Sequence, residues 1–376
     1  MVKTKLYIIR HAEAEGNLYR RAHGWYDSRL TKAGIEQVKR LAGRMESEII
    51  DVLYSSDVRR TVLTAGAVSY ACNIDIKQTD TLRERSMGNW EDMPWSECMR
   101  LNPLAAYGFG REIDSHPPEG ESLLDLYERV SSALMGILER HEGKSVCVVS
   151  HATAIGAMLA FILYGDICEY RNMKEVGNAS VSLVEYENGK FVPVYINDIT
   201  HIEGVRKHRA RLPEGFEGKA ELWFRSVDGK ADVQRAIESW KNSWIAVHGS
   251  DAGFSDDSAE SEIKRMLRVE KNAVRFAMLN ETIAGTLLLD TANYEEDGCG
   301  HISLVMLNDE FRGYGLAPQL LGEAVSYYRA RGRTKLRLHV SATNKRALRF
   351  YLENDFVVTK KEDAYQGEQY TMKKEI

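Results

Sequence analysis

The first half of the chain alternates short apolar runs with segments of helical period, and this alternation strongly limits the fold. Short apolar runs lie within residues 6–10, 51–56 and 145–151. Segments whose apolar residues recur every three or four positions cover residues 33–48, 57–71, 122–141 and 154–163. Strands that alternate with helices build parallel sheets. The pattern therefore predicts an α/β fold with a parallel sheet.

Residues 180–198 are typical of a β-hairpin with its turn at ENGK, and this hairpin closes the first half near residue 202. A basic stretch with Pro and Gly follows at residues 204–219. We interpret it as a linker, although a solvated helix end fits its RKHRAR portion about equally well. A chain of 376 residues exceeds the usual size of one core. We predict domains at 1–205 and 219–376, with a linker at 206–218.

The pattern restarts after the linker with an apolar run at residues 220–228 and a helical segment at 232–247. Further apolar runs at 274–279, 282–290 and 301–307 indicate a second sheet. The acidic segment 250–262 is the most loop-like part of this half.

Composition excludes several classes of protein. A net charge of −5 argues against a general binder of nucleic acid or anionic membranes. Apolar stretches stay shorter than a bilayer span, and the N-terminus lacks a cleavable signal, so we expect a cytoplasmic protein without membrane contact. The five cysteines are widely spaced without a C-x-x-C pair, so neither a disulfide framework nor a metal site is expected.

Basic residues and imidazoles follow three of the apolar runs of the first half. The first run ends in Arg10 and His11, the second leads to Arg59 and Arg60 in the opening turn of a helix, and the last ends before His151. Ligands of open parallel sheets bind beyond the carboxyl ends of the strands. Arginine forks, helix N-termini and imidazoles together suit phosphoryl transfer. Taken singly, each of these residues is more often a surface or packing residue.

Six ordered segments resemble the histidine phosphatase superfamily, in its phosphoglycerate-mutase-like branch. They are RHAEAEGN, HGWYDSRLTKAGIEQ, SSDVRRTVLTA, LRERSMGNWE, PPEGES and VVSHATAI, spread over about 200 residues. The resemblance implies a three-layer phosphoglycerate-mutase-like domain with a mostly parallel sheet. It implies that His11 is phosphorylated, that Arg10, Arg60 and His151 surround the phosphate, that Asn17 lies close by, and that Glu84 donates a proton to the leaving oxygen.

Two small residues depart from the family pattern. Ala12 replaces the usual Gly after the His, and Ala14 replaces a usual hydroxyl residue, so a contact near the phosphate is missing. The short span between Glu84 and PPEGES is similar to that of the phosphatase members, which favours hydrolysis. A mutase-type phosphoryl transfer, and a regulatory sensor with one catalytically dead domain, remain the alternatives.

The segment RGYGLA, Arg312 to Ala317, follows a strand and a short turn and opens a helix with Pro318 in its first turn. Glycines let backbone N–H groups converge at a helix N-terminus, which favours a pyrophosphate. A plain tight turn is the alternative, because a lone G-x-G is weak evidence.

RGYGLA and the later NKRALRFYLENDF resemble the GNAT acyltransferase superfamily over residues 219–376. The resemblance implies an α+β acyl-CoA N-acyltransferase domain that binds acetyl-CoA along a splayed strand. The implied pyrophosphate contacts are the amides of Arg312, Gly313, Tyr314, Gly315, Leu316 and Ala317. Asn344 would lie near the cofactor, and Tyr351 would donate a proton to the CoA thiolate unless it is a core aromatic.

The general base of this second site is not identified by the sequence, although Glu295, Glu296 and His301 lie near the relevant strand. The two resemblances together predict a bifunctional enzyme, a histidine phosphatase joined to an N-acetyltransferase. Its partners would be a small phosphorylated metabolite and a small amine. The sequence identifies neither substrate, and a homo-oligomer is compatible with it.

Overall fold

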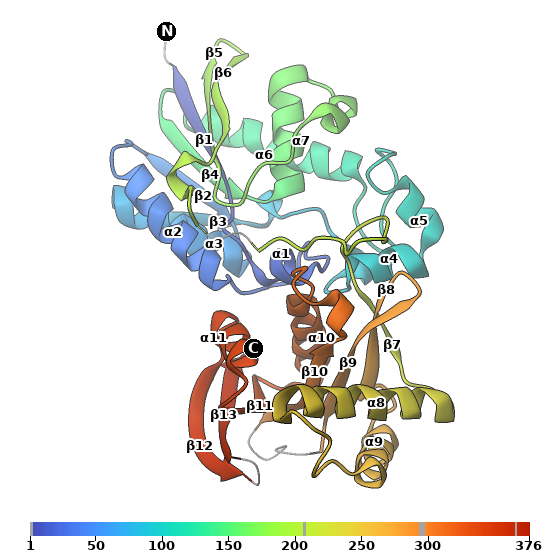
Figure 1. The fold of residues 1–376 in the computed structure, drawn as a ribbon. Helices are drawn as coiled ribbons and strands as arrows, with labels where there is room; N and C mark the ends of the chain where they lie inside the picture. The colour runs from blue at the N-terminus through green and yellow to red at the C-terminus, as the bar shows by residue number, and fades with distance from the viewer. Residues whose placement is uncertain (1–2, 206–207, 293–297, 365–366) are drawn as a thin grey trace. The chain divides into compact units, whose positions relative to one another are not determined.

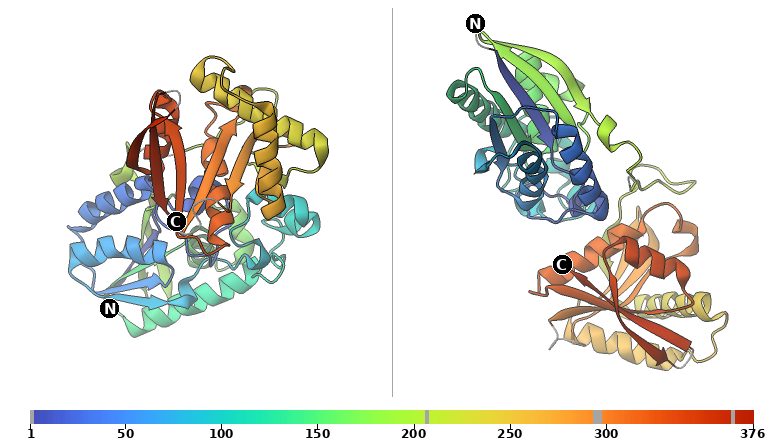
Figure 2. Two further views of the ribbon diagram at one scale, coloured as in Figure 1. Left: turned by 90° about the horizontal axis from the view of Figure 1, so that it is seen from below. Right: turned by 90° about the vertical axis from the view of Figure 1, so that its left-hand side faces the viewer.

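The computed structural model describes residues 3–205, 208–292, 298–364 and 367–376. The chain divides into two compact units, one of Met1–Met93 with Cys98–Lys207 and the other of Pro94–Glu97 with His208–Ile376. Each unit contains its own β-sheet (Figures 1 and 2). The predicted domain limits at residues 205 and 219 remain predictions.

The sheet of the first unit has six strands in the order β3-β2-β4-β1-β5-β6. The strands are β1 (Thr4–Arg10), β2 (Val52–Ser56), β3 (Ile76–Thr79), β4 (Ser145–Ser150), β5 (Val181–Glu187) and β6 (Lys190–Asp198). β1 to β4 pair in parallel, whereas β5 pairs antiparallel with β1 and β6. The hairpin turn has positive φ at Asn188 (53°) and Gly189 (75°), as the ENGK signal requires.

Helices cover both faces of this sheet (Figure 1). α6 (Leu123–Arg140) and α7 (Ala152–Tyr164) pack on one face, and α2 (Lys32–Met45) and α3 (Arg59–Cys72) pack on the other. The shorter helices are α1 (Glu15–Tyr19), α4 (Trp95–Leu101) and α5 (Pro103–Gly108). The predicted capping box is present at α6, where the Ser122 hydroxyl accepts the N–H of Asp125.

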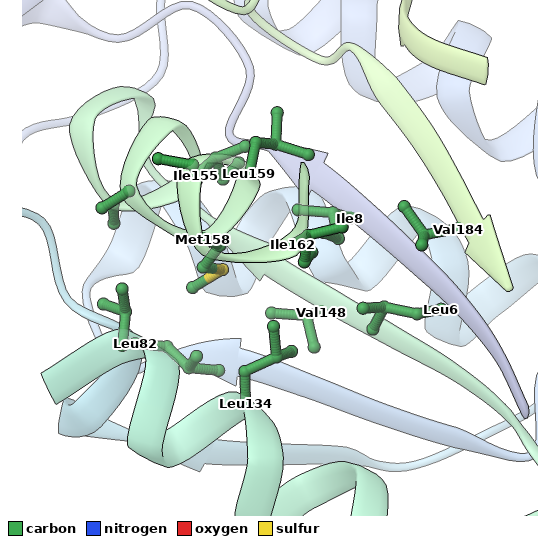
Figure 3. Packing of buried hydrophobic residues seen from close by; sticks show 14 of the residues in the cluster. Leu6, Ile8, Leu82, Leu134, Val148, Ile155, Met158, Leu159, Ile162 and Val184 are labelled. Carbon is green, nitrogen blue, oxygen red and sulfur yellow. The ribbon is translucent and has the colours of Figure 1, made fainter. Parts of the chain in front are cut away.

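Strand alternation explains the three layers. Leu6 and Ile8 of β1 pack in one apolar cluster with α6 and α7 (Figure 3), whereas Tyr7 and Ile9 pack in another with α2 and α3. Successive side chains of a strand point to opposite faces, so a strand with helices on both sides is apolar throughout. The predicted mostly parallel, three-layer α/β architecture is thereby confirmed.

The second unit has a seven-stranded sheet in the order β12-β13-β11-β10-β9-β8-β7. The strands are β7 (Trp223–Ser226), β8 (Val274–Leu279), β9 (Thr282–Asp290), β10 (Cys299–Leu307), β11 (Lys335–Ser341), β12 (Val357–Ala364) and β13 (Gly367–Glu375). β10 and β11 pair in parallel, and the other neighbours pair antiparallel. The second sheet and the α+β class are as predicted.

The helices of this unit are α8 (Gly229–His248), α9 (Asp256–Val269), α10 (Ala317–Arg329) and α11 (Lys345–Glu353). The loop predicted over residues 250–262 is wrong for its second part, because α9 begins at Asp256. The Ser255 hydroxyl caps the helix by accepting the N–H of Ser258 at 3.2 Å. The negative charges of the acidic residues in the first turn interact favourably with the positive, N-terminal end of the helix dipole. Acidic residues here are therefore typical of the start of a helix.

Candidate active sites

Parallel pairing in the first unit brings the two predicted histidines together. Arg10 at the end of β1 pairs in register with Ser150 at the end of β4, and His11 and His151 each follow directly. The two imidazole rings lie 5.2 Å apart, centroid to centroid, with 59° between their planes. Both rings are buried, His11 with 5% and His151 with 0% of its surface exposed.

Hydrogen bonds assign a proton position to each imidazole. Nδ1 of His11 lies 2.8 Å from the carbonyl oxygen of Ala12, so Nδ1 carries the proton and Nε2 keeps its lone pair. Nδ1 of His151 accepts from Nη2 of Arg60 at 3.0 Å, so its proton is on Nε2, which donates to the Ser56 hydroxyl at 3.0 Å.

Electrostatics keep both rings uncharged at neutral pH. Burial, aided by the positive charges of Arg60 and Arg10, holds the pKa of His11 well below its usual range. Burial and Arg60 lower the pKa of His151 in the same way. A neutral imidazole is the form that can act as a nucleophile.

The two arginines of the prediction are buried beside these rings. Arg60 is 1% exposed and donates from Nη1 to the carbonyl of Tyr26 at 2.8 Å and from Nη2 to that of Gly24 at 2.6 Å. Arg10 donates to the carboxylate of Glu175 at 2.9 Å. The Nε groups of both arginines are buried without a hydrogen-bond partner among the described residues. These donors suit an anion.

Burial lowers the pKa of Arg60 to about 10, so the guanidinium still carries its charge at neutral pH. The neighbouring Arg59 is exposed, and its backbone N–H donates to Asp27 at 2.7 Å. The structure thus places Arg60 in the buried site and Arg59 at the surface.

Glu84 is held at the N-terminus of α7. Its Oε1 accepts the N–H of Arg85 at 2.9 Å and of Ala154 at 3.0 Å, and its Oε2 accepts the N–H of Thr153 at 3.0 Å. The residue that precedes this helix is His151. One helix end therefore positions both the predicted proton donor and the second histidine.

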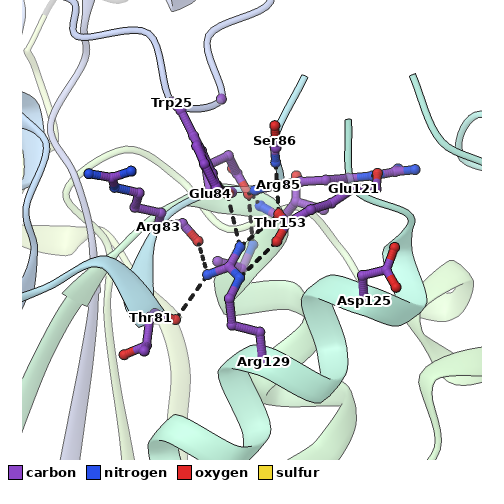
Figure 4. A network of polar contacts seen from close by, with 12 residues as sticks. Trp25, Thr81, Arg83, Glu84, Arg85, Ser86, Glu121, Asp125, Arg129 and Thr153 are labelled. Carbon is purple, nitrogen blue, oxygen red and sulfur yellow. Dashed lines mark hydrogen bonds and ion pairs between the residues drawn. The ribbon is translucent and has the colours of Figure 1, made fainter. Parts of the chain in front are cut away.

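A second group of contacts fixes the backbone around Glu84. The Glu84 carbonyl accepts from the indole of Trp25 at 2.8 Å and from Nη2 of Arg129 at 3.1 Å (Figure 4). Arg129 also donates to the carbonyls of Thr81 at 2.9 Å and Arg83 at 3.0 Å. The Glu84 loop is therefore held by an arginine that the sequence analysis did not select.

Asn17 is linked to the His11 backbone through Asn178, a residue that was not predicted from the sequence. The Asn17 side-chain oxygen accepts the N–H of Ala14 at 3.0 Å and lies 3.3 Å from Nδ2 of Asn178. Nδ2 of Asn178 also donates to the backbone carbonyl of His11 at 3.1 Å. Asn178 lies just before the hairpin, where the sequence pattern offered no signal.

Glu91 is a further missed residue. Its carboxylate accepts the N–H groups of Gly24, Trp25, Tyr26 and Met87 at 3.0, 2.6, 2.9 and 3.1 Å. The loop held in this way presents the two carbonyls that bind Arg60. Glu91 is the last residue of the quoted LRERSMGNWE, so its place in that segment was the available signal.

Ala12 and Ala14, the two residues that differ from the family pattern, are both buried. The methyl group of Ala12 packs with Ala179 and Ile202, and its N–H donates to the hydroxyl of Thr64 at 3.0 Å. Ala14 is the residue before α1 and is buried. The methyl group of Ala12, which a glycine would lack, therefore lies among apolar side chains.

The predicted pyrophosphate segment of the second unit forms a glycine turn before α10. Gly313 and Gly315 have φ of 86° and 75°, Leu316 precedes the helix, and Ala317 is its first residue. Such positive φ values favour glycine. The Arg312 side chain donates to the Leu307 carbonyl at 2.8 Å and pairs with Asp309.

β10 and β11 part from one another midway. Their pairing runs from Cys299–Lys335 to Ile302–Leu338, whereas the strands continue to Leu307 and Ser341. The register of β10 against β9 also shifts between Ile302 and Leu304. A parting pair of strands next to a glycine turn fits an extended cofactor with a pyrophosphate, such as acetyl-CoA.

The other residues predicted for this site lie on or near α11 and β10. Tyr351 is buried, contacts the rings of Phe350 and Phe356, and has its pKa raised to about 12 by burial. The Asn344 side-chain oxygen accepts the N–H of Ala347 at 3.0 Å and so caps α11. Its contact with the cofactor remains a prediction. Glu295 and Glu296 lie outside the described residues.

His301 forms a pair with His339 of β11, with ring centroids 5.4 Å apart. Burial, with His339, lowers the pKa of His301 to about 4, and burial also lowers the pKa of His339. His339 is the first residue of β11 beyond the pairing with β10. Two uncharged imidazoles thus lie where the strands part.

Within the described residues, no group of His, Cys, Asp and Glu has the geometry to hold a metal ion. The same part of the chain has no helix that combines the length and the apolar character of a membrane span.

Comparison with known proteins matches both units to families. Residues 6–199 match the model described as "Histidine phosphatase superfamily (branch 1)", and residues 237–356 match "Acetyltransferase (GNAT) family". Phosphoserine phosphatase 1 of Hydrogenobacter thermophilus is 34% identical over 202 residues, which cover 53% of this chain and 94% of that protein.

"Probable phosphoglycerate mutase GpmB" of Proteus mirabilis is 34% identical over 192 residues, 50% of this chain and 87% of that protein. The solved structure of Bacillus stearothermophilus YhfR is 31% identical in sequence, with a TM-score of 0.51. The match covers 53% of this chain and 100% of the YhfR chain. These findings confirm both resemblances. The chain belongs to the histidine phosphatase superfamily, branch 1, and carries a GNAT-family acetyltransferase domain after it.

Proposed function

We propose that the first unit hydrolyses a phosphomonoester through a phosphohistidine at Nε2 of His11. The observation that carries this proposal is the hydrogen bond from Nδ1 of His11 to the Ala12 carbonyl, since it leaves the Nε2 lone pair for attack. Buried cationic groups from Arg10 and Arg60 supply the charge that a phosphoryl group needs around it.

In the first step, Nε2 of His11 forms a bond to phosphorus while the bond to the ester oxygen breaks. The imidazole becomes positively charged, and its Nδ1–H strengthens its bond to the Ala12 carbonyl. Arg10 and Arg60 offset charge on the equatorial oxygens. Glu84, as the carboxylic acid, gives its proton to the leaving oxygen, so the product departs as an alcohol.

In the second step, a water attacks phosphorus from the side that the alcohol left, and the bond to Nε2 breaks. The Glu84 carboxylate takes a proton from this water and returns to the acid form. The three N–H groups that hold this carboxylate keep it at the end of α7 in both steps. Phosphate is released, and His11 is again neutral.

The named relatives suggest the first substrates to try. One carries the name of a phosphoserine phosphatase and another that of a probable phosphoglycerate mutase. Mutase activity is therefore the second candidate function. It predicts isomerisation of a phosphoglycerate that depends on a bisphosphate primer, whereas hydrolysis releases inorganic phosphate without one.

The experiment measures phosphate release by the full chain from phosphoserine, 3-phosphoglycerate and p-nitrophenyl phosphate. Phosphate release that is lost in His11→Ala supports the proposal. Primer-dependent isomerisation without net release favours the mutase. A sensor role is favoured instead if the wild type binds these phosphates without turning any of them over.

We infer that the second unit transfers an acetyl group from acetyl-CoA to a small amine. Acetyl-CoA supplies the activated thioester when bound. The amides of the turn at 312–317 would hold its pyrophosphate, as the positive φ values of Gly313 and Gly315 support. Tyr351, protonated at neutral pH because burial raises its pKa to about 12, would give a proton to the thiolate. His301, uncharged and beside the parting strands, would accept the proton of the amine.

The assay follows free CoA formation from acetyl-CoA with a panel of primary amines. Tyr351→Phe keeps the ring that packs against Phe356 and removes only the hydroxyl. We expect kcat to fall about 10- to 100-fold with KM for acetyl-CoA nearly unchanged. Equal kcat in wild type and variant would remove Tyr351 from the proposal.

A further inference from the structure

The segment that follows the first unit lies directly against the glycine turn of the second. The backbone N–H of Arg211 donates to the Tyr314 carbonyl at 2.8 Å. Nε2 of His208 lies 2.8 Å from the Gly315 carbonyl, so it donates to that oxygen. A β-carbon on Gly315 would meet the Arg209 carbonyl at 2.9 Å. The described residues 208–211, called here the linker strip, are therefore part of the turn's surroundings.

These two bonds control where the turn's amides point. A trans peptide unit is planar, and its C=O and N–H point in opposite directions. The bond to the Tyr314 carbonyl therefore directs the N–H of Gly315 away from the linker strip, and the bond to the Gly315 carbonyl does the same for the N–H of Leu316. Both amides belong to the set proposed to bind the pyrophosphate.

The turn needs this restraint because of its composition. Gly313 and Gly315 have φ of 86° and 75° and lack the β-carbon that limits other residues. A glycine turn loses much conformational entropy when its amides must converge on one anion. Contacts that hold two peptide planes in advance reduce this loss at the moment of binding.

The linker strip also brings positive charge. The side chains of His208, Arg209 and Arg211 are exposed, and no ion pair of the two arginines is recorded within the described part of the chain. CoA carries a pyrophosphate and a 3′-phosphate, whereas the chain as a whole has a net charge of −5. Two cations next to the turn therefore favour an anionic ligand locally, by an attraction that salt screens.

We propose that the linker strip is a positioning element of the CoA pyrophosphate site, which couples cofactor binding to the ordered conformation of this segment. The proposal rests on the acetyl-CoA site proposed above. The coupling is reciprocal, because whatever releases the strip weakens CoA binding, and bound CoA holds the strip in place. The predicted domain start at residue 219 would exclude this element.

The test measures the Kd of CoA for the full chain by titration calorimetry. Arg211→Pro removes the N–H donor, and Arg211→Ala is its matched control because it removes the same charge and keeps that N–H. We expect Arg211→Pro to bind CoA about fivefold more weakly than Arg211→Ala, as for the loss of one hydrogen bond. His208→Ala should weaken binding by a similar factor.

A salt series separates the role of charge. Arg209→Ala should bind CoA about threefold more weakly at low salt and like wild type at about 1 M salt. Arg235→Ala, which removes an exposed arginine of α8, should bind CoA like wild type at both. The difference between Arg211→Pro and Arg211→Ala should persist at high salt, because it arises from a backbone hydrogen bond.

Hydrolysis of p-nitrophenyl phosphate by the same samples shows whether the first unit of each variant is folded. A cooperative thermal unfolding transition shows whether the second unit is folded. Equal CoA affinity of Arg211→Pro, Arg211→Ala and His208→Ala would overturn the role of the linker strip while leaving the acetyl-CoA site in place. A wild type that does not bind CoA at all would overturn the acetyl-CoA site and this proposal with it.

Discussion

Nη2 of Arg60 lies 3.0 Å from Nδ1 of His151, and this contact joins the third and last motifs of the phosphatase half. Arg60 also donates to the carbonyls of Tyr26 and Gly24 from the loop that Glu91 holds. One buried guanidinium thus sets the tautomer of His151 and presents its charge to the proposed phosphate site.

Arg60→Ala should lower kcat/KM for phosphate release about 100- to 1,000-fold, because it removes a charge-stabilising donor from a buried site. Arg59→Ala is the matched control, since this neighbour of the same helix turn is exposed. Steady-state kinetics of both variants on p-nitrophenyl phosphate check the prediction. Similar losses in the two variants would contradict the selection of Arg60.

Glu84→Gln should reveal its role through the leaving group. An alkyl phosphate needs a proton on its departing oxygen, whereas p-nitrophenolate leaves without one. We expect kcat to fall about 100-fold or more for phosphoserine and much less for p-nitrophenyl phosphate. The ratio of the two rates, measured in wild type and variant, is the readout. An equal fall for both substrates would show that Glu84 does not act as the proton donor.

The stability of the first unit should fall as the pH drops below about 6.5, the ordinary pKa of histidine. The pKa values of His11 and His151 lie well below this in the folded protein, because both are buried beside Arg60. Between the folded and unfolded pKa values the unfolded chain binds more protons, so the free energy of unfolding rises with pH through that window.

His11→Asn removes one of these two groups, so its free energy of unfolding should depend less on pH than that of wild type. Hydrogen exchange of β1 and β4 amides at about pH 7.5 and 5.5 measures this for the first unit alone. The stability difference between wild type and His11→Asn should shift in favour of the variant at the lower pH. A constant difference would contradict the lowered pKa of His11.

Ala12→Gly restores the usual residue of the family and tests whether the alanine impairs the site. Because its methyl packs with Ala179 and Ile202, we expect the variant to lose about 1 kcal/mol of stability and to gain little in kcat. Thermal unfolding and phosphatase assays of the two proteins measure both effects. A large gain in kcat would instead favour the view that the natural chain has a weakened, sensor-like site.

Much of the fold followed from local pattern. Helix and strand periods predicted the parallel sheet, and the rule that parallel strands end at one edge predicted that Arg10, His11 and His151 meet. The preference for Arg60 over Arg59 came from the family resemblance alone. The structure supports this preference, because Arg60 is buried.

Residues that depend on tertiary contacts were not predictable in this way. Arg129 and Asn178 act on backbone carbonyls distant in sequence, so neither leaves a local pattern. The start of α9 was mistaken for a loop, because acidic residues occur both in loops and in first helical turns. The linker strip bonds to carbonyls of a glycine turn more than 100 residues later, as the separation of 107 between His208 and Gly315 shows.

Trapping of the covalent intermediate shows whether phosphoryl transfer passes through His11. The full chain is mixed with a ³²P-labelled phosphomonoester, quenched in alkali within the first turnovers, and digested, and the labelled peptide is identified by mass spectrometry. We predict an alkali-stable, acid-labile phosphoryl group on His11 in wild type and none in His11→Asn. Phosphate release by the wild type with no label on His11, or with equal label in His11→Asn, would show that the reaction does not proceed through a phosphohistidine at His11.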